Sequence, residues 1–214
     1  MSNITKIIDG YRNFYNLFFK EDVEKYKNLA SVGQFPKTMV IACSDSRVDP
    51  SIVTNAEPGE LFVIRNVANL VPPYQEDSST YHGTSAALEF AVRNLGIENI
   101  IIIGHSKCAG IQALVMDDNK PTEDFSFIRE WVNIAKKAKD KVLLDAANSP
   151  HNDMICTECE KESILLSLEN LKTYPWILEK IQSKTLNIYG WYFDLLSGII
   201  SQYDHDARKF ISII

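Results

Sequence analysis

A run of four isoleucines, Ile100 to Ile103, places the strongest constraint on the fold of this chain. A strand that is apolar at every position is typical of a parallel sheet, because helices cover both of its faces. The segments from Met39 to Cys43, from Leu61 to Val67 and from Leu186 to Phe193 are further candidate strands, and helix-like spacing of apolar residues lies between them. We therefore expect an α/β fold with a mainly parallel central β-sheet flanked by helices.

Two of these strands end in residues that carry chemistry. The Met39 strand leads into Cys43-Ser44-Asp45-Ser46-Arg47, and the isoleucine run leads into Gly104-His105-Ser106-Lys107-Cys108. We expect the Met39 strand to lie between the Leu61 and Ile100 strands. Since the carboxyl ends of parallel strands meet at one edge of the sheet, both motifs then open on one crevice, which is where open α/β sheets bind ligands.

The two motifs together offer the ligands of a metal site. Cys43, His105 and Cys108 supply two thiolates and an imidazole, a set that suits zinc. Three protein ligands leave a fourth position open, as in catalytic zinc sites. Asp45, paired with Arg47, would either orient a group bound to the metal or take the fourth position itself and close the site.

Each half of this site also has an ordinary interpretation. A cysteine that follows a strand is usually a core residue, and a lone His-x-x-Cys is a weak signal. The placement of both halves at the ends of adjacent buried strands favours the metal site.

The first twenty residues predict an aromatic helix, because apolar side chains recur three and four positions apart. These residues are Ile4, Ile7, Ile8, Tyr11, Phe14, Tyr15 and Phe18. So large an apolar face must be buried on its own domain or across a subunit interface, and both remain open. With 214 residues the chain fits a single domain, 1–214, with residues 1–35 as an N-terminal helical arm and residues 36–200 as the zinc-binding α/β core.

Composition narrows the range of partners. The formal net charge of -6 disfavours nucleic acid and anionic membranes, and no apolar run reaches membrane-spanning length. The first residues lack the basic and then apolar pattern of a signal peptide, so we expect a cytoplasmic protein. Its four cysteines are then expected to be reduced or bound to metal. No Gly-x-Gly-x-x-Gly follows a strand, which argues against dinucleotide binding.

A second cysteine pair, Cys156 and Cys159, supports an alternative function. The two thiols would serve a structural zinc site or a redox pair in a non-catalytic zinc or redox protein. Thr157 with Glu160 looks like a capping box that opens a helix, which would place Cys159 in the first turn as an ordinary, partly buried thiol. We favour that ordinary interpretation.

At the level of whole motifs the sequence resembles the β-class carbonic anhydrases. The paired motifs Cys43 to Arg47 and Gly104 to Cys108 carry the resemblance. The stretches Glu57 to Tyr74 and Cys156 to Glu162 are similar to the plant-type branch of that family. The similarity extends from about Gln34 to Gly198.

The resemblance implies one Zn²⁺ per subunit, held by Cys43, His105 and Cys108, and reversible hydration of carbon dioxide to bicarbonate and a proton. It implies that Asp45 and Arg47 form the catalytic dyad. The family's bicarbonate-regulated branch has Trp at the position of Val40, so we expect an open site with Asp45 off the metal.

The resemblance to the β-class carbonic anhydrases also implies a substrate pocket and an oligomer. The pocket residues are Gln34, Phe62, Val67, Phe90, Ala109 and Gly110. Two of them depart from the family pattern, since Ala109 replaces a glycine and Phe90 replaces a frequent tyrosine. The expected assembly is a homo-oligomer, a dimer or higher, in which the N-terminal helix clasps a neighbouring subunit. Hydrolysis of carbon disulfide on the same scaffold is an alternative activity.

Overall fold

The computed structural model describes residues 2–76, 81–117, 126–146 and 152–214. The chain divides into two compact units, residues 1–35 and residues 36–214. Among the described residues, no helix is both long and apolar enough to cross a membrane.

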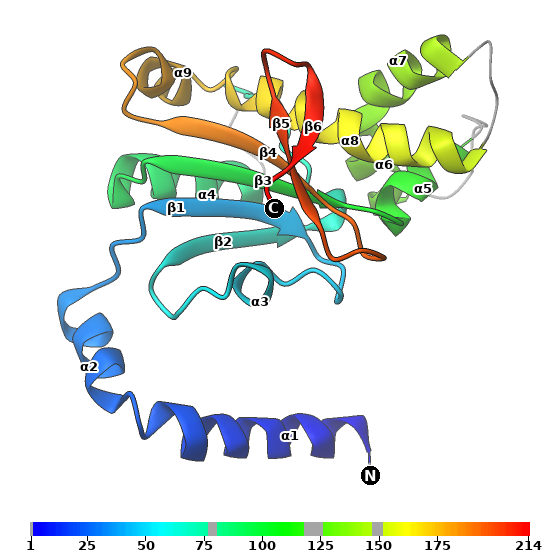
Figure 1. Ribbon diagram of the computed structural model, residues 1–214. Coiled ribbons are helices and arrows are strands. Elements are labelled where there is room, and N and C mark those ends of the chain that lie inside the picture. Colours follow the sequence, from blue (N-terminus) through cyan, green and yellow to red (C-terminus); the bar gives the residue numbers. More distant parts are fainter. Residues whose placement is uncertain (1, 77–80, 118–125, 147–151) are drawn as a thin grey trace. The chain divides into compact units, whose positions relative to one another are not determined.

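The larger unit is built on a six-stranded sheet with the strand order β2-β1-β3-β4-β5-β6 (Figure 1). The strands are β1 (Thr38–Cys43), β2 (Leu61–Asn66), β3 (Asn99–His105), β4 (Asn187–Phe193), β5 (Ile200–Asp204) and β6 (Lys209–Ser212). The first four are parallel, whereas β5 and β6 form an antiparallel edge. The expected α/β fold and the expected place of β1 between β2 and β3 are therefore confirmed.

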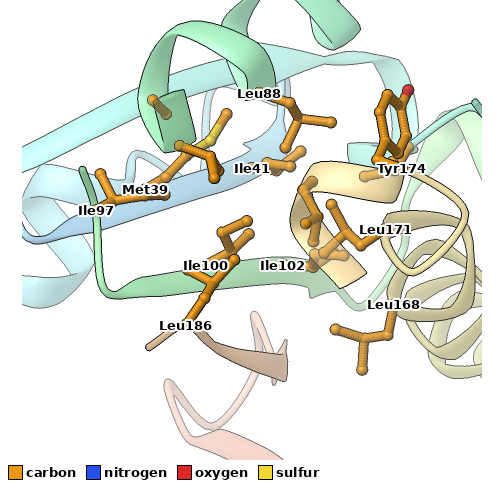
Figure 2. Close-up of a cluster of buried hydrophobic side chains, with 14 of the residues drawn as sticks. Met39, Ile41, Leu88, Ile97, Ile100, Ile102, Leu168, Leu171, Tyr174 and Leu186 are labelled. Atoms are coloured by element: carbon orange, nitrogen blue, oxygen red, sulfur yellow. The ribbon is translucent and has the colours of Figure 1, made fainter. Parts of the chain in front are cut away.

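The isoleucine run lies at the centre of this sheet, and all four of its side chains are buried. In register, Met39 lies beside Ile100 and Ile41 beside Ile102, and these alternate residues share one face of the sheet. That face packs against Leu88 of α4 (Gly83–Glu89), against Leu168 and Leu171 of α8 (Asn152–Leu171), and against Tyr174, which directly precedes α9 (Pro175–Gln182) (Figure 2). Val40, Ala42, Ile101 and Ile103 lie in a second cluster, as the two-residue period of a strand requires.

Helices connect the parallel strands. They are α3 (Pro50–Thr54), α4 (Gly83–Glu89), α5 (Ala109–Met116), α6 (Phe127–Val132), α7 (Lys136–Ala146), α8 (Asn152–Leu171) and α9 (Pro175–Gln182). Short π- and 3₁₀-helical turns accompany them: η2 (Val67–Asn69), η3 (Phe90–Leu95) and η4 (Asn133–Ala135). Helix α5 starts directly after Cys108, and α8 packs against β3, β4 and α5.

The predicted capping box at Thr157 is wrong. Helix α8 already begins at Asn152, so Thr157 and Cys159 lie inside the helix and not in its first turn. Glu160 is 3% exposed and is directed into the core, where it has other partners.

The N-terminal unit consists of α1 (Asn3–Phe14), a π-helical turn η1 (Tyr15–Phe19) and α2 (Val23–Val32). Ser2 caps α1 by accepting a hydrogen bond from the backbone N–H of Thr5. The predicted apolar face exists but is largely exposed, with Ile7 66%, Tyr11 63% and Phe18 61% exposed.

Candidate metal centre

Three side chains meet where β1 and β3 end. Cys43 is the last residue of β1, His105 is the last residue of β3, and Cys108 precedes α5. Because β1 and β3 are hydrogen-bonded neighbours, their ends lie side by side. The ligand atoms all lie within 4.8 Å of one another, and the two Sγ atoms are 3.9 Å apart. All three residues are at least 95% buried.

The imidazole of His105 is set up as a ligand. Its Nδ1 is 2.9 Å from the carbonyl oxygen of Ser106, so Nδ1 donates a proton and Nε2 keeps a free lone pair. Nε2 is buried and has no hydrogen-bond partner among the described residues. An unsatisfied buried nitrogen is unfavourable. A zinc ion between Nε2 and the two sulfurs would satisfy it, so the residues present fit this metal.

The electrostatics favour a thiolate at Cys43. A hydrogen bond from the Cys108 thiol, opposed by burial and assisted by His105, lowers the pKa of Cys43 to about 4. The same bond and burial raise the pKa of Cys108, because the two sulfurs share one proton. Binding of zinc would release that proton, since both cysteines then act as thiolates.

Asp45 and Arg47 lie at the rim of this cluster. The Arg47 guanidinium donates through Nε and Nη2 to the two carboxylate oxygens, at 2.8 and 2.6 Å. This bond holds the pKa of the Asp45 carboxyl well below its usual range. Asp45 Oδ2 is 4.0 Å from His105 Nε2, so the carboxylate flanks the candidate metal position. Its alternative role as a fourth ligand in a closed state stays a prediction.

Arg65, in β2, holds the backbone of the Cys43–Arg47 motif in place. The sequence alone did not predict this role. Its Nε donates to the carbonyl of Cys43 at 3.0 Å, and its Nη2 donates to the carbonyl of Asp45 at 2.6 Å. Its Nη1 pairs with Asp49 at 2.8 Å. An arginine inside an otherwise apolar strand was the available signal.

Glu160 holds the backbone of the Gly104–Cys108 motif in place. The sequence did not predict this role either. Its carboxylate accepts the backbone N–H of Cys108 at 3.0 Å and the hydroxyl of Tyr192 at 2.8 Å. Burial raises the pKa of this carboxyl. Glu160 therefore fixes the backbone that carries one of the candidate ligands.

Two pairs of the predicted pocket residues lie close together, and their role in substrate binding stays a prediction. The rings of Phe62 and Phe90 are 5.8 Å apart. Gly110 packs so closely on Val67 that an added Cβ would lie 2.7 Å from Val67 Cγ1. Ala109 is exposed, so its extra methyl group does not crowd the backbone. Gln34 lies in the N-terminal unit, and its role stays a prediction.

The second cysteine pair is separate from this cluster. Cys156 and Cys159 both lie in α8, and Cys159 is 1% exposed. Within the described part of the chain, the group that fits a metal consists of Cys43, His105 and Cys108 alone.

Comparison with known proteins agrees with this geometry. The sequence model of the carbonic anhydrase family matches residues 38–200. A relative from Arabidopsis thaliana, β carbonic anhydrase 5, chloroplastic, is 45% identical over 209 residues, covering 95% of this chain and 67% of the relative. The structure of the β-carbonic anhydrase CcaA is 32% identical with a TM-score of 0.89, covering 99% of this chain and all of that one.

A further solved structure comes from the filamentous ascomycete Sordaria macrospora. It is described as a tetrameric β-carbonic anhydrase, is 26% identical and has a TM-score of 0.72, and the match covers 92% of each chain. The chain therefore belongs to the carbonic anhydrase family, in the plant-type branch of its β class.

Proposed function

We infer that the protein is a zinc-dependent carbonic anhydrase that converts carbon dioxide and water reversibly to bicarbonate and a proton. Cys43, His105 and Cys108 hold the zinc. The observation that carries this assignment is the buried His105 Nε2, which lacks a partner among the described residues and faces two sulfurs 3.9 Å apart. Zinc in such a site acidifies a water molecule and thereby supplies the nucleophile at neutral pH.

The dyad orients the reacting water. Asp45 is held as a carboxylate by Arg47, so it can only accept a hydrogen bond on the oxygen that faces the metal position. An acceptor in this place fixes the direction of the proton on the reacting water and leaves its lone pair free to attack. Carbon dioxide is small and nonpolar, which suits an apolar pocket, and the part that Val67, Phe62 and Phe90 take in such a pocket stays a prediction.

The experiment measures zinc content and stopped-flow hydration of carbon dioxide in the native protein and in two variants. The Cys43→Ser variant is expected to lose zinc and activity together, whereas Asp45→Asn is expected to keep zinc and lose most activity. Full activity in either variant would contradict the assigned roles.

The same measurement tests the rival function of a non-catalytic zinc or redox protein. Replacement of both Cys156 and Cys159 by Ser is expected to leave one zinc per chain and normal hydration. Loss of zinc from this double variant would favour the rival. Carbon disulfide offered to the zinc-loaded protein tests the alternative substrate, and we expect no hydrolysis comparable to the hydration of carbon dioxide.

We propose that the protein is a homo-oligomer in which the N-terminal helix binds a neighbouring subunit. The exposed apolar face of α1 and η1 supports this, because a patch of that kind needs a partner surface. The tetrameric relative from Sordaria macrospora agrees with it. Sedimentation of the full chain and of a chain lacking residues 1–20 is the test, and an unchanged oligomer in the shorter chain would overturn the proposal.

The cytoplasmic location expected from the sequence also stays a prediction. A reducing compartment suits thiolate ligands, and none of the four cysteines is in a disulfide.

A further inference from the structure

One peptide group beside the metal centre is held at both of its ends. The carbonyl of Lys107 accepts a hydrogen bond from Nη2 of Arg47 at 3.2 Å. The N–H of the same peptide belongs to Cys108, and it donates to Oε1 of Glu160 at 3.0 Å. Because a peptide group is planar and its C=O and N–H point in opposite directions, a contact that fixes one end also fixes the other.

The Arg47 end of this peptide is connected to the reacting position. The Nη2 atom that donates to Lys107 also donates to Oδ2 of Asp45 at 2.6 Å. Oδ2 is the carboxylate oxygen that lies 4.0 Å from His105 Nε2, beside the candidate metal position. The place of the Lys107 carbonyl therefore affects the place of the Asp45 carboxylate.

The peptide follows a residue whose backbone conformation needs support. Lys107 has a φ of 59°, in the left-handed region that residues with a side chain rarely occupy. The Arg47 side chain is 52% exposed, so it is a weak anchor for this backbone. Glu160 is 3% exposed, and its contact with the N–H end is shielded from water. Glu160 is therefore the stronger of the two anchors.

Glu160 has a fixed position of its own. Its second oxygen, Oε2, accepts a hydrogen bond from the hydroxyl of Tyr192 at 2.8 Å. One turn further along α8, Ile164 packs so closely on Gly104 and Gly190 that an added Cβ would lie 2.6 Å or 2.8 Å from an Ile164 carbon. This contact sets the distance of α8 from β3 and β4, and Glu160 lies on the same face of the helix.

We propose that Glu160 is a positioning residue for the catalytic dyad, which acts through the Lys107–Cys108 peptide on Arg47 and so sets the place of the Asp45 carboxylate. The inference rests on the proposed function, because the dyad orients a reacting water only in that reaction. Residues that hold a catalytic group from outside in this way typically change activity about 10- to 100-fold when they are replaced.

The test compares two replacements of Glu160 with a control in the same helix. Alanine removes both acceptor oxygens. Glutamine keeps an oxygen for the Cys108 N–H, and its NH₂ group can donate to the Tyr192 hydroxyl. The control is Ser167→Ala, two turns further along α8, where a buried Oγ accepts the backbone N–H of Val71 at 3.3 Å. All three variants alter a buried polar side chain of α8, but the control leaves the Lys107–Cys108 peptide unchanged.

Two measurements on the zinc-loaded proteins follow the dyad. Nitrogen-15 NMR records the Arg47 Nε–H signal and its exchange with water, and stopped-flow kinetics record the hydration of carbon dioxide. In Glu160→Ala we expect the Arg47 Nε–H to exchange about 10-fold faster, and kcat to fall about 10-fold with KM unchanged. Glu160→Gln is expected to recover most of both values, and Ser167→Ala is expected to match the native protein.

The possible results of these measurements separate the inference from the proposed function. An Arg47 Nε–H signal in Glu160→Ala identical to that of the native protein would overturn the inference. The same signal change in Ser167→Ala would also overturn it, because the change would then follow from a general loosening of α8. Absence of hydration in the native protein would instead overturn the proposed function.

A double variant tests whether Glu160 acts through Arg47. Independent effects on kcat multiply, whereas two residues that act through one contact do not add to each other. We expect the double variant Glu160→Ala with Arg47→Lys to have the kcat of Arg47→Lys alone. A further 10-fold loss in the double variant would overturn the inference.

Hydrogen exchange in Arg47→Lys covers the case in which Glu160→Ala does not fold. If the peptide is held at both ends, loosening its carbonyl also loosens its N–H. The amide proton of Cys108 is therefore expected to exchange about 10-fold faster than in the native protein. Arg93→Lys, which alters a surface pair with Glu89, is expected to leave this exchange unchanged. An unchanged Cys108 exchange rate in Arg47→Lys would overturn the inference.

Discussion

The carboxylate of Asp45 and the guanidinium of Arg47 face each other in a two-bond fork just beyond the end of β1. The two side-chain bonds are 2.8 and 2.6 Å long, and the backbone N–H of Arg47 adds a third bond to the same carboxylate at 2.9 Å. Arg47 also donates to the carbonyl of Lys107 at 3.2 Å, which ties the two motifs together. The fork therefore sets the position of the carboxylate relative to both halves of the site.

Replacement of Arg47 by Lys tests this fork. An ammonium keeps the charge but cannot form two parallel bonds to one carboxylate, so Asp45 loses its fixed orientation. We expect hydration of carbon dioxide to fall about 10- to 100-fold, with zinc content unchanged. Stopped-flow kinetics and metal analysis check this.

The matched control for that variant is Arg93→Lys. Arg93 pairs with Glu89 at 2.8 Å on an exposed helical surface, so its replacement is expected to change neither activity nor zinc content. Equal activity of the two lysine variants would show that the fork has no catalytic role.

Arg65→Lys is expected to destabilise the protein. The three N–H groups of a lysine lie on one nitrogen, so they cannot reach the carbonyls of Cys43 and Asp45 and the carboxylate of Asp49 as the three nitrogens of Arg65 do. We expect the free energy of unfolding of the zinc-loaded protein to fall by about 2 kcal/mol, measured by urea denaturation.

The Asp49→Asn variant separates the ion pair from the carbonyl contacts. Asparagine keeps the cap on α3, and the pair is partly exposed, so the loss is expected to stay below about 1 kcal/mol. A loss as large as that of Arg65→Lys would assign the effect to the ion pair.

Local patterns were sufficient to predict the core of the site. Cys43 and His105 are the last residues of two apolar strands, so their meeting followed from the parallel arrangement alone. Arg65 and Glu160 could not be assigned in this way, because their partners lie 16 or more residues away in the sequence. The contact of Trp131 could not be predicted for the same reason, because its indole Nε1 donates to the carbonyl of Val67, 64 positions away in the sequence.

The wrong predictions also have physical causes. Thr157 and Glu160 have the spacing of a capping box, but α8 starts earlier and the Glu160 carboxylate binds Cys108 and Tyr192. The hairpin of β5 and β6 was not predicted, since its short strands are half-buried or exposed and show no clear alternation.

Cys159 is expected to resist alkylation in the folded protein. Burial raises the pKa of its thiol to about 12, so the reactive thiolate is absent at pH 8. The half-buried Cys156 is expected to react first with iodoacetamide, and Cys159 only after unfolding, as mass spectrometry of labelled peptides would show.

The raised pKa of Cys159 also makes the stability of the folded protein depend on pH. A thiol whose pKa is raised by folding keeps its proton in the native state and loses it in the unfolded chain between pH 9 and about 12. Stability therefore falls as the pH rises through this window, and Cys159→Ala is expected to reduce that fall. An identical pH dependence in the native protein and the variant would contradict the assigned pKa.

Gly110→Ala tests the close contact between α5 and the segment that carries Ala68. The new Cβ would lie 2.7 Å from Val67 Cγ1 and 3.0 Å from Ala68 Cβ. The turn η2, in which Ala68 and Asn69 have positive φ values, must therefore move. Overpacking of this kind costs about 1 to 3 kcal/mol, partly offset by the better helix propensity of alanine. We expect a lower free energy of unfolding together with weaker hydration activity, because Val67 and Ala68 border the metal centre.

Gly83→Ala is the control, since an added Cβ at the start of α4 meets nothing within 4 Å. It is expected to be neutral or to stabilise the protein by about 0.5 kcal/mol, with normal activity. Urea denaturation and stopped-flow hydration on both variants decide the question. If Gly110→Ala matched Gly83→Ala in both measurements, the spacing between α5 and the Val67 segment would not control the site.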